Sequence, residues 1–196
     1  VALVALGFWI SPPGRESVQQ WLGGKGLPDE RHVAALRFAG GGGSEGTGSG
    51  ESALACGFRH YLSFRLGQLE QYHPDFRMVP VGGSSDAPAR TAAETRGTCG
   101  ANLVLEGRIT GSEDFAISID VRDTDSGREL DSWEVQESPA NVAAIQLDPV
   151  VAAAGMLGVE TTDEQKRRIA SGGTTVPGAL RPYLEGLGHL RSAEWD

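Results

Sequence analysis

Residues that build common active sites are scarce in this chain of 196 amino acids. It has only 2 cysteines and 4 histidines, with no CxxC pair and no HExxH motif. No lysine stands where a phosphate-binding GxxxxGK[ST] loop needs one, and a VAIK-like lysine, HRD and DFG are all missing. These absences argue against a zinc site and a kinase domain. We predict a fragment that is not an enzyme and binds no cofactor or metal.

Basic residues are also few. The chain has 17 Lys and Arg against 26 Asp and Glu, which gives a formal net charge of −9. An acidic domain repels the phosphate backbone of DNA and RNA, so no nucleic-acid partner is expected. The two cysteines, Cys56 and Cys99, allow at most one disulfide. Two free thiols are favoured over a bridge, because free Cys behaves as a small apolar residue.

Long apolar runs are limited to Val1–Ile10, about half of what spans a bilayer. This run ends in Phe8-Trp9, and Trp favours the membrane interface. We interpret residues 1–10 as the end of a truncated transmembrane helix and residues 11–30 as a juxtamembrane connector, with a buried core element as the alternative. The connector has few basic residues, which favours the non-cytoplasmic side.

The most regular pattern lies between Gly100 and Glu134. Ala101–Ile109 is apolar, and Phe115–Val121 alternates strictly between apolar and small or polar residues, the mark of a half-buried strand. Asp123-Thr124-Asp125-Ser126-Gly127 resembles the start of a calcium loop, but Gly127 and Arg128 do not fit that motif. We therefore expect three antiparallel strands, joined at Asp123–Gly127 by an Asx-type turn.

Four elements are expected before these strands: the strand Arg31–Phe38, the helix Ser52–Tyr72, the strand Phe76–Val81 and the helix Ala87–Arg96. Ser49 or Ser52 is a candidate N-cap of the first helix, and Ser84 or Asp86 is a candidate N-cap of the second. The second helix is expected to end at Gly97 or Gly100. Pro80 places the second strand at an edge or a strand end. The order β-α-β-α-β-β-β predicts an α/β (α+β) fold: a mixed sheet with parallel first strands, an antiparallel meander and helices mainly on one face.

A helical segment follows this domain. Pro139–Leu157 is predicted as a helix that Pro149 kinks or splits. Residues 158–176 are predicted as a linker with a short helix, Asp163–Arg168, capped by Thr162 or Asp163, and a last amphipathic helix is expected at Pro177–Ser192.

The stretch from Gly40 to Gly50 contains the candidate ligand residues Gly40, Gly41, Gly42, Gly43 and Ser44. A literal GxGxxG begins at Gly41, but in so glycine-rich a run that match is close to automatic, and the acidic residue expected about 20 positions later is missing. A flexible surface loop is favoured.

Three segments of the chain resemble those of a known family: HVAALRF, ALACGFRHYLSFRLGQLEQYHPDFRMVPV and GANLVLEGRITGSEDFAISIDVRDTDSGREL. Over residues 33–157 the chain resembles the TolB-like amino-terminal domain, which occurs in bacterial proteins ahead of tetratricopeptide repeats, often behind a serine/threonine kinase domain and one membrane helix. Residues 177–196 look like the start of such a repeat region. The glycine-rich stretch departs from the family pattern.

The resemblance implies a membrane-anchored, extracytoplasmic sensor or protein-interaction domain of a signalling protein whose parent chain is a serine/threonine kinase. It implies a protein partner, and a homodimer would couple two such kinases. The sheet edge and the helix pair are the expected contact surface, since an edge strand can add an extended peptide. A structural spacer and a small-ligand or nucleotide-binding domain using the glycine-rich stretch stay as alternatives.

Overall fold

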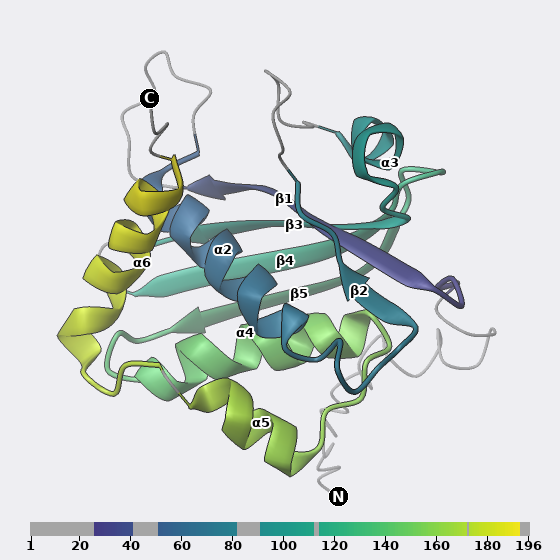
Figure 1. Ribbon diagram of the computed structural model, residues 1–196. Helices are drawn as coiled ribbons and strands as arrows, with labels where there is room; N and C mark the ends of the chain where they lie inside the picture. Colours follow the sequence, from purple (N-terminus) through teal and green to yellow (C-terminus); the bar gives the residue numbers. More distant parts are fainter. Residues whose placement is uncertain (1–25, 41–50, 82–90, 112–113, 172, 193–196) are drawn as a thin grey trace, which may run out of the picture.

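The computed structural model describes residues 26–40, 51–81, 91–111, 114–171 and 173–192 (Figure 1). Four sequence predictions lie wholly or mostly outside these residues. They are the membrane helix 1–10, residues 11–25 of the connector, the glycine-rich stretch from Gly41 on, and the candidate helix caps Ser84 and Asp86. No helix within the described part is long and apolar enough to cross a membrane.

A five-stranded sheet in the order β2-β1-β3-β4-β5 forms the centre of the structure (Figure 1). β1 is parallel to β2 and β3, whereas β3, β4 and β5 form an antiparallel meander. The mixed sheet confirms the predicted fold class and places β3 in its middle. The strands are β1 (Arg31–Gly40), β2 (Phe76–Met78), β3 (Leu103–Thr110), β4 (Phe115–Asp123) and β5 (Glu129–Glu137).

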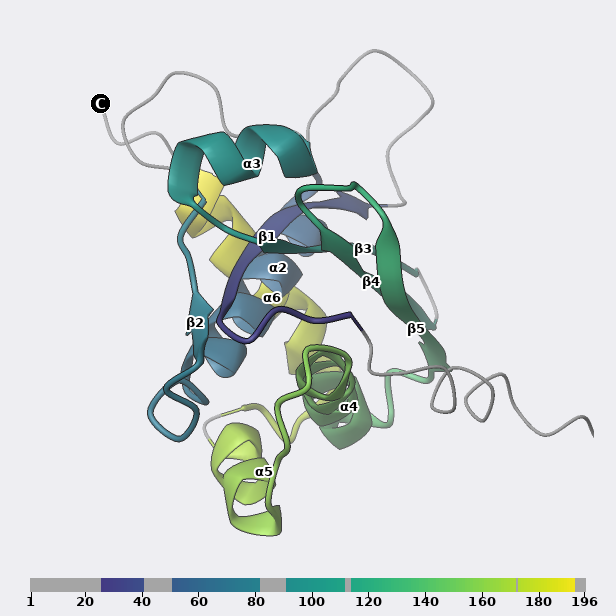
Figure 2. The ribbon, with the colours of Figure 1, turned by 90° about the vertical axis from the view of Figure 1, so that its right-hand side faces the viewer.

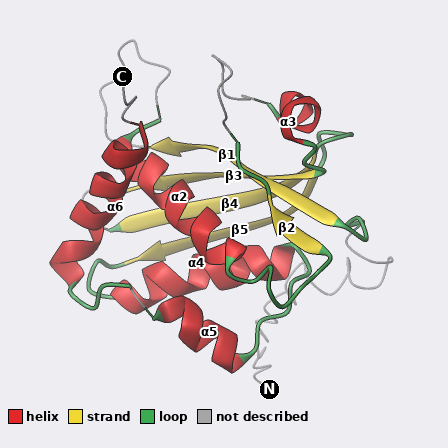
Figure 3. Ribbon diagram, viewed as in Figure 1, coloured by secondary structure: helices red, strands yellow, loops and turns green. Residues whose placement is uncertain are grey.

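Helices cover the two faces of the sheet unequally, as predicted. α2, α4 and α6 supply the main core together with one sheet face, and α3 covers a small second cluster on the other face. In Figure 2, α3 lies at the top and α4 and α5 at the bottom, with the strands between them. The helices, red in Figure 3, are α2 (Ala53–Gly67), α3 (Ala92–Cys99), α4 (Val142–Met156), α5 (Asp163–Ala170) and α6 (Pro177–Ser192).

The alternation in β4 explains the main core. Phe115, Ile117, Ile119 and Val121 are buried and face α2 and α4, whereas the residues between them are only partly buried. Phe38 and Phe58 add an edge-to-face aromatic pair with ring centroids 5.8 Å apart. This packing arises because successive strand residues point to opposite faces.

Several predicted boundaries are wrong. The helix expected at Ala87–Arg96 begins at Ala92, because Thr91 is extended and forms a reciprocal capping box with Glu94; it ends at Gly100, whose φ is 72°. α2 ends at Gly67 rather than Tyr72, since the next residues form tighter three-residue turns. The second strand stops at Met78, although its edge position is as predicted.

Two predicted helices in the C-terminal part are found, with changes to their ends and to the role of Pro149. α4 runs continuously through the buried Pro149, so the predicted split does not occur. Tertiary packing compensates for the hydrogen bond that Pro cannot donate, because Val150 and Ala153 beside it are fully buried. α5 is capped by Thr162, one of its two candidate caps, and extends to Ala170.

α6 packs backbone to backbone on α2. A Cβ atom on Gly57 would lie 1.7 Å from the Leu184 carbonyl oxygen, and one on Gly188 would lie 1.9 Å from the Ala53 carbonyl oxygen. Only hydrogen fits at both positions, so the two glycines set the approach of the helices. Leu184 is 1% exposed and belongs to the main core. Whether α6 also begins a repeat region, as the domain division predicts, stays a prediction.

The segment between α5 and α6 is attached to the domain by two buried side chains. Gln146 donates to the Thr174 carbonyl at 2.8 Å and accepts from the Thr174 N–H at 3.0 Å. Arg65 donates to the Ser171 carbonyl at 3.1 Å and lies over the ring of Tyr61. These bonds use backbone groups of Ser171 and Thr174, shortly before the start of α6.

Candidate functional site

The carboxyl end of β1, where open α/β sheets place ligands, is closely packed. A Cβ on Gly40 would lie 1.9 Å from Ser52 Oγ, so this glycine lets β1 contact the cap of α2. The other four candidate ligand residues, Gly41, Gly42, Gly43 and Ser44, lie outside the described residues. The ligand loop therefore stays a prediction.

A partly buried ion pair lies beside this strand end. Glu51 Oε1 accepts a hydrogen bond from the Phe38 N–H at 2.7 Å, and the Glu51 carboxylate binds Arg59 at 3.0 Å. The carboxylate thus uses a backbone donor released by the irregularity in the β1–β3 ladder. A negative charge in front of α2 disfavours a phosphate there.

The two cysteines lie on opposite faces of the sheet. Both are free thiols, and Cys99 packs with the small cluster on the far face of the sheet from the main core. Burial and Glu51 raise the pKa of the Cys56 thiol against the opposing effect of Arg59. Since the thiolate is the reactive form, Cys56 is held in its unreactive state.

Histidines and turn carboxylates do not assemble into a shared site in the described part of the chain. Burial, Arg59 and Arg191 lower the pKa of His60 to about 4, so it is neutral at pH 7. Asp123 Oδ1 accepts from the backbone N–H groups of Asp125 and Ser126, and these bonds lower its pKa. The predicted Asx turn is confirmed, and no group of three His, Cys, Asp or Glu among the described residues is arranged to hold a metal.

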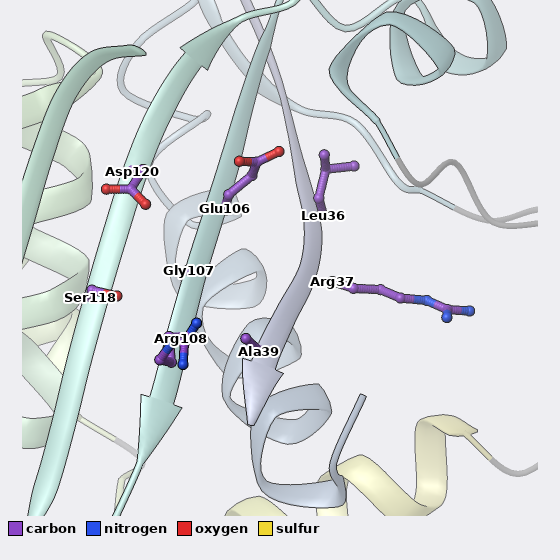
Figure 4. Close-up of a pocket in the computed structure, with 8 residues that line it drawn as sticks. All are labelled: Leu36, Arg37, Ala39, Glu106, Gly107, Arg108, Ser118 and Asp120. Atoms are coloured by element: carbon purple, nitrogen blue, oxygen red, sulfur yellow. The ribbon is translucent and has the colours of Figure 1, made fainter. Parts of the chain in front are cut away.

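The part of the sheet face opposite the main core that α3 leaves uncovered carries mainly polar side chains, and we call it the open face. It holds a shallow concavity of about 420 Å³ between β1, β3 and β4, with Glu106, Arg108, Ser118 and Asp120 in its lining (Figure 4). Arg37, at the β1 irregularity, extends away from these strands (Figure 4). The concavity therefore has charges of both signs in its lining.

Arg122 organises the charges of the open face. Its guanidinium donates to Glu106 and to Glu129, both at 2.9 Å, and so bridges β3, β4 and β5. Burial and the nearby Glu129 raise the pKa of Asp120, and Arg122 opposes that shift. The carboxylates outnumber the guanidiniums here, so the face is acidic towards β5.

β5 ends the sheet and exposes one side of its backbone ladder. It is nine residues long and contains four acidic residues and no basic one: Glu129, Asp131, Glu134 and Glu137. Trp133 and Val135 on its core side are partly buried against the main core. Asp148 of α4 interacts electrostatically with Glu137, and burial and this neighbour raise the pKa of Asp148. The other edge strand, β2, has only three residues.

The acidic edge was not singled out from the sequence, although a signal existed. The alternation of Ser132, Trp133, Glu134 and Val135 is visible in the chain. The position of β5 at the sheet edge and the bridging role of Arg122 required the strand order.

No protein-family model and no curated protein matches this sequence. Among solved structures, the C-terminal domain of LpoB from Salmonella enterica has a TM-score of 0.40 at 16% identity, covering 62% of this chain and 92% of that one. A lipoprotein from Neisseria meningitidis has a TM-score of 0.42 at 14% identity, covering 75% and 100%. TolB from Acinetobacter baumannii has a TM-score of 0.39 at 12% identity, covering 67% of this chain and 29% of TolB. Similarity at this level carries no information on activity, partner or family.

Proposed function

We propose that this chain is a non-catalytic protein-interaction domain whose contact surface is the β5 edge with the adjoining open face. The observation that carries the proposal is the long unpaired edge of β5 within the described structure. A strand edge presents unpaired N–H and C=O groups, and natural proteins either protect such an edge or use it to add a partner strand.

The wider setting is proposed from the sequence resemblance alone. In it, residues 1–10 anchor the domain to a membrane, the domain lies on the non-cytoplasmic side and acts as a sensor, and the parent chain is a serine/threonine kinase with repeats from residue 177 on. A homodimer would couple two such chains. α6 packs into this domain through Leu180 and Leu184, so a repeat region starting there would be rigidly joined to it.

A thermal-shift screen separates this proposal from its two alternatives. The chain is heated with an extended-peptide library, with nucleotides and with divalent cations. A peptide at 100 times its dissociation constant adds about 2.7 kcal/mol, which is a shift of roughly 5–11 °C for a protein of this size. A shift with peptides alone supports the interaction domain. A shift with nucleotides alone supports the ligand loop, and no shift with any class supports the spacer.

A further inference from the structure

We propose that the free edge of β5 takes up an extended peptide of a partner protein in which basic residues alternate with apolar ones. This inference rests on the proposed function and names the chemistry of its partner. The partner segment would become a sixth strand beside β5.

The backbone of β5 supplies the first argument. The Ser132 N–H donates to the side chain of Asp131 in the same strand, with 3.0 Å between the nitrogen and Oδ1, so an added strand would have to displace this bond. Because successive residues of an antiparallel strand direct their backbone groups to alternate sides, Ser132, Glu134 and Gln136 direct theirs to the free edge. No other described segment hydrogen-bonds to these groups through its backbone.

The side chains of β5 supply the second argument, because an added strand continues both sheet faces. On the open face, Glu134 is exposed and has no Lys or Arg partner among the described residues. A Lys or Arg of the added strand would lie beside it. On the core side, an apolar residue would extend the partly buried surface of Trp133 and Val135. Alternating basic and apolar residues therefore match Glu134 on the open face and Trp133 and Val135 between Asp131 and Glu137 on the other.

Charge also selects against a second copy of the chain at this edge. Two β5 strands side by side would bring the acidic residues of one strand against those of the other, with no basic residue in either strand, although Glu129 is paired with Arg122 of β4. Like charges in directly opposed positions destabilise strand pairing. The acidic edge therefore disfavours self-pairing and favours a basic partner.

The test measures binding of a nine-residue peptide of alternating Lys and Val to the full chain by fluorescence anisotropy. A peptide of the same composition with its Lys and Val in two blocks controls for the attraction of any cation to this acidic protein. We expect the alternating peptide to bind at least about tenfold more tightly than the block peptide, because only its side chains match both faces. Hydrogen exchange should slow at Glu134 and Gln136, whose N–H groups face the free edge, and stay unchanged at β2.

Two charge reversals locate the site. Glu134→Lys, on the exposed face of β5, should weaken binding by about five- to tenfold, since it replaces an attraction with a repulsion. Glu164→Lys makes the same change of net charge on the exposed surface of α5 and should weaken binding by less than about twofold. A peptide with Glu in place of Lys should prefer the Glu134→Lys variant.

Three results would overturn the inference: equal binding of the alternating and block peptides, equal weakening by both variants, or β5 protection in a dimer without peptide. Peptides of other chemistry that protect β5 would overturn the inference but leave the proposed function intact. Failure of every peptide in the thermal-shift screen would overturn both.

Discussion

Replacing Gly57 with Ala is expected to loosen α6 from α2. The new Cβ would lie 1.7 Å from the Leu184 carbonyl oxygen, while real Cβ atoms essentially never approach closer than 3.0 Å. α6 must therefore retreat by about 1.3 Å, a gap that forfeits at least half of the dispersion contacts across it. Leu180 and Leu184, each 1% exposed, are the side chains most affected.

The expected free-energy change follows from these two leucines. Full burial of a Leu contributes about 1.5–3 kcal/mol, so losing half or more of two such contributions costs about 2–4 kcal/mol. Ala is a better helix former than Gly by about 1 kcal/mol, which offsets part of the loss. We expect the free energy of unfolding to fall by about 1–3 kcal/mol, which lowers Tm by roughly 2–4 °C per kcal/mol.

Urea unfolding followed by circular dichroism measures this change. Gly186 of α6 is the matched control, because a Cβ there meets nothing within 4 Å. Gly186→Ala should be neutral or stabilising, whereas Gly188→Ala should behave like Gly57→Ala, since its Cβ would lie 1.9 Å from the Ala53 carbonyl oxygen. If Gly57→Ala is as stable as Gly186→Ala, the close crossing of α2 and α6 is refuted.

Three further predictions concern single side chains. Burial, Arg59 and Arg191 lower the pKa of His60 from 6.5 to about 4, so between these pH values the unfolded chain binds more protons than the folded one and the free energy of unfolding falls as the pH drops. His60→Gln should reduce the slope of the free energy of unfolding against pH by up to about 1.4 kcal/mol per pH unit. An unchanged pH profile in urea unfolding would contradict this. Arg59→Met leaves the Glu51 carboxylate, whose side chain is 8% exposed, without its cation and should lower the free energy of unfolding by about 3 kcal/mol in urea. Arg59→Lys should lower it by less, and equal losses for the two variants would show that the ion pair does not stabilise the fold. Thr91→Ala removes the side-chain cap of α3 and should cost about 1 kcal/mol in the same assay, whereas Thr91→Ser should cost much less; identical values would show that the cap is not formed.

Local chemistry explains which features could be predicted from the chain. The alternation of Phe115–Val121, the Asx turn at Asp123 and the cap at Thr162 each depend on residues within a few positions of one another. The start of α3 was mispredicted because Ser84, Asp86 and Thr91 are all suitable cap residues by type. Only Thr91 has a Glu at the third helical position to complete the capping box.

The candidate site, too, could be predicted from the sequence only in part. β-augmentation at a sheet edge was predicted from the sequence, but which strand forms the long edge depended on the order β2-β1-β3-β4-β5. The Glu51–Arg59 pair could be anticipated only as a surface contact. Glu51 is drawn towards the sheet because it accepts the hydrogen bond of the Phe38 N–H, which has no acceptor in β3 at the irregularity of β1.

The sequence by itself determined the strands, most helices and the acidic balance, because hydrophobic period, turn residues and charge are properties of short segments. Tertiary structure alone decided how α6 is attached. Gly57 and Gly188 are far apart in the chain, and nothing in either segment marks the other as its partner. The same holds for the open face, where Arg122 joins Glu106 and Glu129 from three strands. Such contacts arise from sheet register and helix crossing, which place side chains together only after the chain has folded.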